Sequence, residues 1–392
     1  MRSLRRRLSP QIRFDPPIRF KSLQTIVSML SGFKLSFSIV LAASLLGFMQ
    51  SPSAASGLSA IPNSVDRLAP YVATNTLVGS SAAVLVPATE VEIPSGNPLT
   101  DPLRFTAPET LLFSDTANGK LNSISLVEAA MIAGGLTNPN SIQRYQAKYA
   151  ALREKLLQRF EQFRADQAGD PILARIEFIH QTLYRNLLTG GYSAEATDLA
   201  ATFDTGIYNC ASATLLFVSL AGDIDLDAQA IELPGHVRAV IETSDHQYEI
   251  EATCPVWPDA VRAEPRIQSA GASDHPYNLR RAGMPSIGRE VSPLGLLAMI
   301  YYNRGVDAFS ENRFADSIAV TRRALLLDPD NRLAYGNLLA AVNNWALALG
   351  DRGNFNDAQT LLNEGRQLDP AHLPFIHNAE HLRQLQLQSA KE

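Results

Sequence analysis

Apolar residues in the middle of the chain follow a helical period. Between residues 123 and 199 they recur at intervals of three and four, the spacing of one face of an α-helix. One helix is predicted over about 142–166, where the apolar positions are Tyr145, Tyr149, Leu152, Leu156, Phe160 and Phe163. A second is predicted over 171–188 and ends at the pair Gly190-Gly191, because glycine commonly terminates helices.

Beyond residue 200 the pattern changes from helices to short strands. An apolar helix is predicted to follow Cys210, and strand patterns lie at 227–233, 236–243 and 247–253. The last two strands are predicted to form a hairpin around residues 244–246. Helices followed by short antiparallel strands predict an α+β domain, which we place at residues 123–290.

The last hundred residues contain two segments with a common spacing of small, aromatic and proline residues. In the first, Tyr301 is followed at 4, 13, 16, 23 and 28 residues by Gly305, Phe314, Ser317, Ala324 and Pro329. The second has Trp345, Ala346, Gly353, Phe355, Ala358, Leu362 and Pro370 in matching places. This spacing resembles tetratricopeptide repeats, with about seven inserted residues, and implies an all-α array over residues 291–392. A generic helical tail is the alternative. Since about three repeats are normally needed for a stable stack, we expect the array to pack on the preceding domain.

The start of the chain has the pattern of a secretory signal. Residues 1–34 contain eight Lys or Arg and one acid, and residues 35–49 are an apolar run without charged residues, followed by small residues. We predict a signal peptide over residues 1–55 and export to the periplasm or the extracellular space. The alternatives are a membrane tether through residues 35–49 and a start codon placed upstream of the true signal. Residues 56–122 are predicted to be a linker or irregular lead-in, with one strand pattern at 83–93.

Composition narrows the classes of function. The chain carries a net charge of −5, and because residues 1–34 carry +7, the remainder carries −12. Such an acidic body argues against nucleic acid as a partner. Two cysteines are too few for a disulfide scaffold or a four-cysteine zinc site. His377 and His381 have a spacing seen in metal sites but no acidic partner, so we expect neither a metal nor a cofactor.

Cys210 is the candidate nucleophile because it stands where the apolar helix begins. A helix N-terminus carries partial positive charge and unpaired N–H groups, which favour a thiolate and can bind an oxyanion. Two alternatives remain at this stage. Cys210 could be an inert core cysteine, or it could form a disulfide with Cys254.

His236 and Glu251 are the candidate base and orienting acid. The start of one strand and the end of its antiparallel neighbour lie at the same edge of a sheet, so the two side chains can meet there. Glu249 lies on the same face as Glu251 but further from His236, and we therefore prefer Glu251. A thiolate, an imidazole and a carboxylate in this order can perform nucleophilic acyl transfer.

These residues resemble the transglutaminase-like superfamily. The resemblance lies in the stretches 208–210, 234–237 and 251–253, with 26 residues from Cys210 to His236 and 15 from His236 to Glu251. It covers roughly residues 140–260 and implies a papain-like core of helices on an antiparallel sheet. It also implies Cys210 as nucleophile, His236 as base and Glu251 as orienting acid, where members more often have Asp. Tyr208 is a candidate for the further oxyanion donor that members often place upstream of the cysteine.

Two functions fit these features. The first is a cysteine acyltransferase, peptidase or amidase that acts on a protein or peptide through the Cys210-His236-Glu251 triad, with the repeats binding that substrate or a partner. The second is a catalytically inactive transglutaminase-like scaffold that serves protein assembly.

Overall fold

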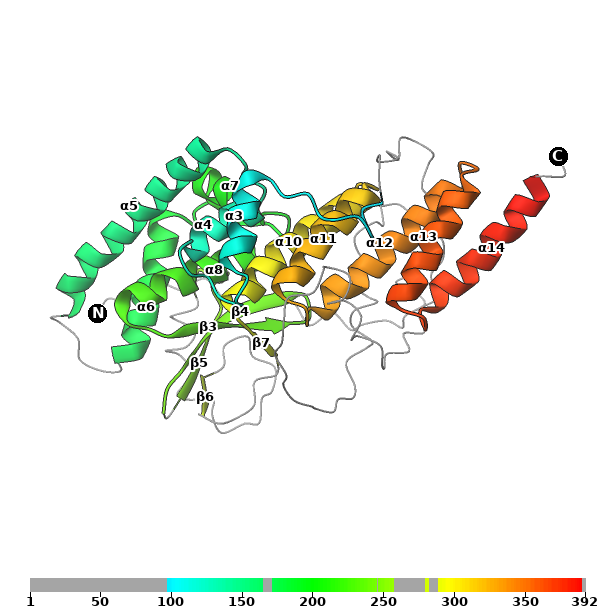
Figure 1. Ribbon diagram of the computed structural model, residues 1–392. Coiled ribbons are helices and arrows are strands. Elements are labelled where there is room, and N and C mark those ends of the chain that lie inside the picture. Colours follow the sequence, from blue (N-terminus) through cyan, green and yellow to red (C-terminus); the bar gives the residue numbers. More distant parts are fainter. Residues whose placement is uncertain (1–96, 165–170, 245, 257–278, 282–287, 390–392) are drawn as a thin grey trace, which may run out of the picture.

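The computed structural model describes residues 97–164, 171–244, 246–256, 279–281 and 288–389. These ranges form a mostly helical α+β structure with a small antiparallel sheet, as the apolar pattern predicts (Figure 1). Within them, no helix is both long and apolar enough to cross a membrane. The predicted signal peptide, the tether at 35–49 and the strand at 83–93 lie outside the described residues.

Helices α3 to α8 form the first part of the chain. Their bounds are α3 Ala107–Asp115, α4 Leu126–Ala133, α5 Pro139–Arg164, α6 Pro171–Asn186, α7 Leu199–Thr205 and α8 Cys210–Ala221. The long helix α5 begins three residues earlier than predicted, because Asn138 Oδ1 accepts from the N–H groups of Asn140 and Ser141 at 2.9 and 3.2 Å. Helix α3 corrects the expectation of an irregular lead-in, since Thr106 and Glu109 form a reciprocal cap at its start.

The sheet is antiparallel throughout and has the strand order β6-β5-β4-β3-β7. The strands are β3 Ala228–Leu233, β4 His236–Glu242, β5 His246–Ile250, β6 Leu279–Arg281 and β7 Arg289–Val291. Strands β3 and β4 match the predicted strands to within one residue, and the hairpin between β4 and β5 is confirmed, but β5 ends at Ile250, three residues before the predicted end at 253. Helix α8 packs against β3 and β4 and places its N-terminus beside the sheet (Figure 1). A separate parallel pair, β1 Gly191–Tyr192 and β2 Ile207–Tyr208, leads into α8.

The C-terminal helices pack one after another and extend away from the sheet (Figure 1). They are α10 Pro293–Ser310, α11 Phe314–Leu327, α12 Arg332–Gly350, α13 Phe355–Leu368 and α14 Leu373–Ser389. Small residues lie where neighbouring helices touch: a Cβ on Gly305 would meet Thr321 Oγ1 at 2.4 Å, and one on Gly365 would meet the Phe375 ring at 2.7 Å. The spacing of small residues in the sequence therefore corresponds to close helix contacts.

Helix α10 connects the two parts of the chain. It packs against α4, α8, β3 and β7 on the sheet side and against α11 and α12 on the other. Its residues Leu296, Leu297 and Ala298 are 1% exposed or less. The expected packing of the C-terminal region on the preceding domain is confirmed, and α10 belongs to the core of both.

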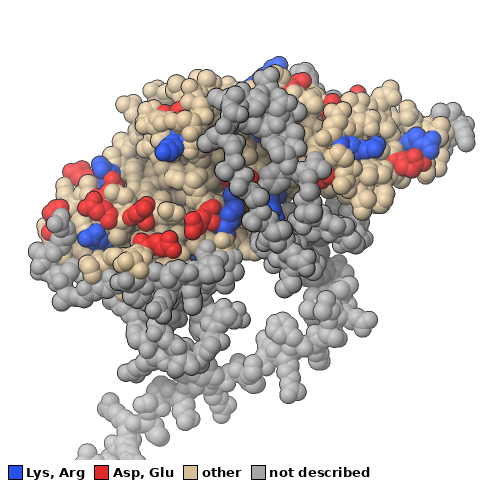
Figure 2. Space-filling model, turned by 60° about the horizontal axis from the view of Figure 1, so that its bottom comes forward, with Lys and Arg blue, Asp and Glu red and all other residues tan. Residues whose placement is uncertain are grey.

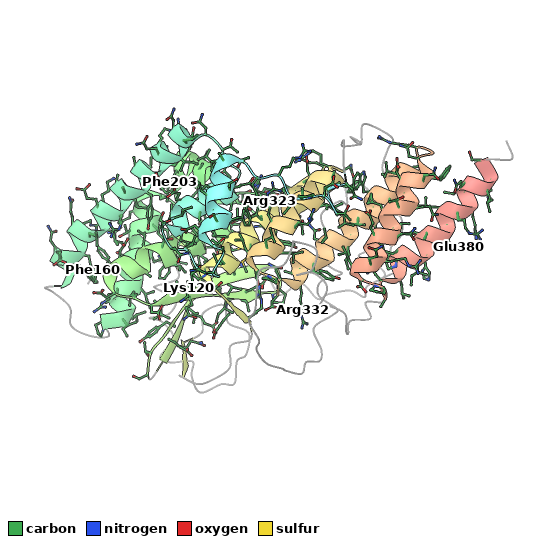
Figure 3. The ribbon with its side chains drawn as sticks, in the orientation of Figure 1. Lys120, Phe160, Phe203, Arg323, Arg332 and Glu380 are labelled. Carbon is green, nitrogen blue, oxygen red and sulfur yellow. The ribbon has the colours of Figure 1, made fainter. Side chains whose placement is uncertain are left out.

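Residues 97–106, which we call the strap, provide a second connection. Arg322 of α11 donates to the carbonyl oxygens of Pro98 and Asp101 at 2.5 and 2.9 Å. Its neighbour Arg323, labelled in Figure 3, donates to Arg104 O at 2.5 Å and pairs with Glu109 at 2.9 Å. The strap thus lies across α11 and fixes α3 to the C-terminal helices.

Candidate active site

Cys210 is the first residue of α8, and the turn that carries it is tightly capped. Asn209 Oδ1 accepts from Ser212 N at 3.0 Å, while Ser212 Oγ accepts from Asn209 N at 2.9 Å. The Asn209 amide also donates to Thr197 Oγ1 at 2.7 Å. The first N–H groups of a helix have no partner within it, and groups of this kind can donate to an oxyanion.

Asn303 of α10 reinforces this cap from the C-terminal side of the molecule. Its side-chain amide donates to Thr197 Oγ1 at 3.1 Å, and Thr197 is 3% exposed. The hydroxyl of Thr197 therefore accepts from both Asn209 and Asn303. Sequence reasoning missed this contact, because the two asparagines are separated by most of the domain.

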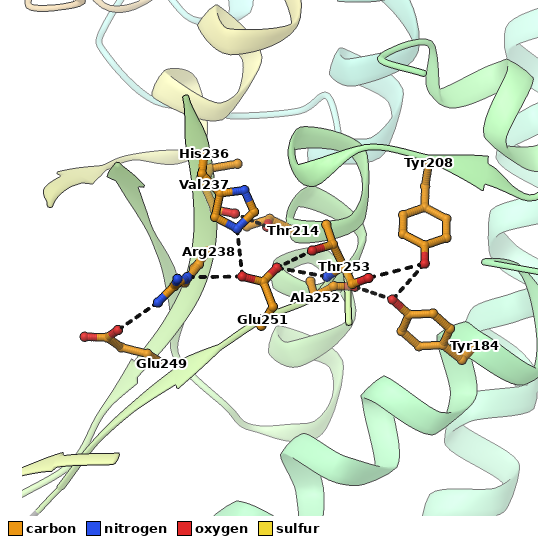
Figure 4. Close-up of polar contacts among 10 residues, drawn as sticks. All are labelled: Tyr184, Tyr208, Thr214, His236, Val237, Arg238, Glu249, Glu251, Ala252 and Thr253. Atoms are coloured by element: carbon orange, nitrogen blue, oxygen red, sulfur yellow. Dashed lines mark hydrogen bonds and ion pairs between the residues drawn. The ribbon is translucent and has the colours of Figure 1, made fainter. Parts of the chain in front are cut away.

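His236 and Glu251 meet at the sheet edge, as the hairpin argument predicts. His236 opens β4, and Glu251 directly follows β5. The distance from His236 Nε2 to Glu251 Oε2 is 2.7 Å (Figure 4). Their side chains are 26% and 9% exposed, so the pair is largely removed from water.

Two further residues hold the Glu251 carboxylate. Arg238 Nε donates to Oε2 at 3.1 Å, and the Thr253 backbone N–H donates to Oε1 at 3.2 Å, with the Thr253 hydroxyl on the same oxygen (Figure 4). Arg238 Nη1 also reaches Glu249 Oε2 at 3.4 Å. The structure therefore brings Glu251 to His236 and Glu249 to Arg238, in agreement with the preference for Glu251. Arg238 was missed, although alternation along β4 places it on the same face as His236.

The Cys210 side chain lies close enough to the His236 imidazole to affect its pKa. Burial lowers the pKa of His236, but the interactions of the ring with Cys210 and Glu251 outweigh burial and raise the pKa to about 9. Burial likewise opposes ionisation of Glu251, yet the bonds from His236 and Thr253 leave the pKa of this carboxyl below its usual value. At neutral pH the pair is thus an imidazolium and a carboxylate.

The two cysteines are not joined by a disulfide, and both are partly exposed. Cys254 lies in the turn after Glu251, where its N–H donates to Glu251 O at 3.2 Å. The disulfide alternative considered for Cys210 is therefore not formed in this structure.

Tyr208, the residue suggested as a further oxyanion donor, is buried. The side chain is 2% exposed, and its hydroxyl contacts Tyr184 Oη at 3.0 Å and Thr253 O at 3.4 Å. The hydroxyl proton thus has acceptors within the protein fold, and the role of oxyanion donor stays a prediction.

Tyr192 is a candidate site residue that the sequence analysis missed. It pairs with Tyr208 across the β1–β2 ribbon, with ring centroids 6.3 Å apart, and is 53% exposed. Burial and the nearby charges of Cys210 and Glu251 raise its pKa. An exposed aromatic ring near the sulfur can contact a bound substrate. No periodicity could have singled it out, because its strand has only two residues.

The described residues hold no group of three or more His, Cys, Asp or Glu side chains that could bind a metal ion. On the face drawn in Figure 2, Lys and Arg are scattered among Asp and Glu across the described surface. Comparison with models of protein families, with curated proteins and with solved structures finds no match for the chain.

Proposed function

We propose that this protein is a cysteine acyl-transfer enzyme or hydrolase of the transglutaminase-like superfamily, with Cys210 as nucleophile, His236 as base and Glu251 as orienting acid. One observation carries the proposal: the His236 ring is hydrogen-bonded to a buried carboxylate at 2.7 Å, and the thiol at the start of α8 lies close enough to raise the pKa of the same ring. A structural histidine needs a partner, but it does not need a cysteine and a carboxylate together. The packing of α8 on a sheet that carries the base and the acid also supports this superfamily.

The chemistry begins with the Cys210 thiolate attacking the carbonyl carbon of an amide or ester. A C–S bond forms, and the carbonyl oxygen becomes an oxyanion that accepts hydrogen bonds from N–H groups at the start of α8. When the tetrahedral adduct collapses, the His236 imidazolium gives its proton to the leaving amine or alcohol. The product of this half-reaction is a thioester on Cys210 and a neutral His236.

The second half-reaction releases the acyl group. Neutral His236 takes a proton from water or from an amine, which attacks the thioester carbonyl and breaks the C–S bond. Water yields a carboxylic acid and an amine yields a new amide, and in both cases the thiolate and imidazolium are restored. Glu251 keeps the imidazole oriented and stabilises its charged form, because its carboxylate is itself fixed by Arg238 and Thr253.

The C-terminal helices are proposed to form a tetratricopeptide-like array that binds the protein or peptide substrate, or a partner. Support comes from the helix pairs joined by close contacts at Gly305 and Gly365. The array begins with α10, which contacts the cap of α8 through Asn303. A bound protein would thus lie on helices that are continuous with the catalytic core. The proposal also includes export of the chain through the predicted signal peptide.

The test measures the reactivity of Cys210 in the full chain. Iodoacetamide is applied across pH 5 to 9, and alkylation of each cysteine is followed by peptide mass spectrometry, with Cys254 as an internal reference. At pH 6 we expect Cys210 to react on the order of tenfold faster in the wild type than in His236→Ala, because an imidazolium stabilises the reactive thiolate. His377→Ala, on α14, is the matched control and should behave as the wild type.

One outcome would overturn the proposal. If Cys210 reacts with the pH profile of an ordinary thiol, and His236→Ala changes neither rate nor profile, the triad has no nucleophile. The inactive scaffold would then be the better description of this protein.

A further inference from the structure

The chain immediately after Glu251 is held at three consecutive carbonyl groups. The carbonyl oxygens of residues 252–254 each accept a hydrogen bond from a side chain of another element. Tyr184 Oη binds the first at 3.0 Å, Tyr208 Oη the second at 3.4 Å and His180 Nε2 the third at 2.8 Å. The two tyrosines are drawn in Figure 4, beside the Glu251 carboxylate.

The three donors are packed against one another. The Tyr184 and Tyr208 rings meet edge to face, with their centroids 5.8 Å apart. The His180 ring lies 4.6 Å from the Tyr184 ring and is 1% exposed. Since a carbonyl oxygen can only accept, His180 must carry its proton on Nε2. Burial lowers the pKa of His180 to about 4, so the ring is neutral at physiological pH.

These contacts connect the two sides of the candidate site. Tyr208 is two residues before Cys210 on the segment that enters α8, whereas the turn at 252–254 follows Glu251. A hydrogen bond between them therefore sets the position of the acid relative to the nucleophile. A catalytic site needs side chains that are fixed in this way, because a displacement of about 1 Å can lower the rate of the reaction about a hundredfold.

We propose that Tyr184 and Tyr208 are positioning residues, which hold the turn after Glu251 against the segment that carries Cys210, with His180 as the third anchor. The proposal rests on the proposed function, because it assigns these side chains to the geometry of the triad. Their effect passes through Glu251 to the His236 imidazole.

The test removes single hydroxyl groups. Tyr184→Phe and Tyr208→Phe each delete one donor and keep the ring. In each we expect Cys210 alkylation at pH 6 to slow by about threefold or more, and the NMR titration midpoint of His236 to fall. The matched control is Tyr335→Phe, which deletes a tyrosine donor to Leu368 O (3.1 Å) in the C-terminal helices and should leave both readouts unchanged.

A role confined to stability would lower the unfolding midpoint without moving either readout. If the tyrosine variants do not fold, two substitutions of His180 provide a second test. His180→Gln keeps an N–H donor near the place of Nε2 and should retain most of the reactivity of Cys210, whereas His180→Leu should lose it. Equal reactivity of these two variants would overturn the proposal.

The outcomes separate the two proposals. Ordinary thiol behaviour of Cys210 in the wild type would refute the proposed function itself. Fast alkylation in the wild type that is unchanged in both phenylalanine variants would refute only the positioning role of the tyrosines.

Discussion

Replacing Glu251 by glutamine tests whether this carboxylate holds His236 in its charged form. The pKa of His236 is raised from 6.5 to about 9, and the side chain is only 26% exposed. That difference corresponds to about 3 kcal/mol in favour of the imidazolium. Interactions with Cys210 and Glu251 together raise the pKa of His236, although burial lowers it. Glu251→Gln keeps the shape of the side chain and removes its charge, so we expect the His236 midpoint to fall by about one pH unit or more.

The assay is a pH titration of the histidine ring protons by NMR, with the His236 signal assigned from the spectrum of His236→Gln. The double variant of Glu251→Gln and Cys210→Ala removes both partners. Its His236 should titrate below 6.5, because only burial then acts on the ring. A wild-type midpoint near 6.5, or a midpoint unmoved by Glu251→Gln, would show that this reasoning is wrong.

The same shift predicts how stability depends on pH. The pKa of His236 in the folded protein lies above its ordinary value, so the protonated ring stabilises the folded protein. This stabilisation is fully present below pH 6.5 and is lost as pH rises through about 9. Between these values the free energy of unfolding should fall by about 3 kcal/mol more in the wild type than in His236→Gln. Urea unfolding of both proteins at pH 6 and pH 9.5 measures the difference. An equal loss in the two would contradict it.

Two further predictions concern the C-terminal helices. In Gly365→Val the new side chain collides with the Phe375 ring, which a Cβ would approach to 2.7 Å. We therefore expect faster hydrogen exchange in α14 and unchanged reactivity of the candidate site. Unchanged protection of α14 would contradict this prediction. In Arg323→Met the buried Glu109 loses its ion pair, and urea unfolding should show a loss of about 3 kcal/mol. Arg313→Met, which removes an exposed pair, should cost under about 0.5 kcal/mol. Equal costs would show that the Arg323–Glu109 pair has no special importance for stability.

The elements around the site could be predicted because they depend on local patterns. The alternation in 236–243 and 247–253 defined the hairpin, and the hairpin alone brings His236 to Glu251. The break before Cys210 marked the start of α8. The choice of Glu251 over Glu249 followed from their distance along the strand and agrees with the observed contacts. The catalytic roles of these residues stay predictions until the alkylation test is done.

The features that could not be predicted depend on contacts between distant segments. Arg322 meets the strap more than two hundred residues away in sequence, and no local pattern records this. Strands β6 and β7 have three residues each, too few for a visible alternation. The donors to the carbonyls after Glu251 come from α6 and β2, where His180 and Tyr184 read as ordinary core residues of an amphipathic helix.

The shared helix α10 limits how this protein can be rearranged. Grafting the C-terminal helices onto another protein would carry along Leu296 and Leu297, whose side chains would then be exposed to water. Cutting the chain after α10 instead would leave α10 behind, and cutting it before α10 would remove the helix that covers α4 and α8, together with Asn303, which supports the capped turn before Cys210. Neither part of the chain can therefore be transferred to another protein as an independent unit. Any new binding specificity is better built by changing α12 to α14 in place.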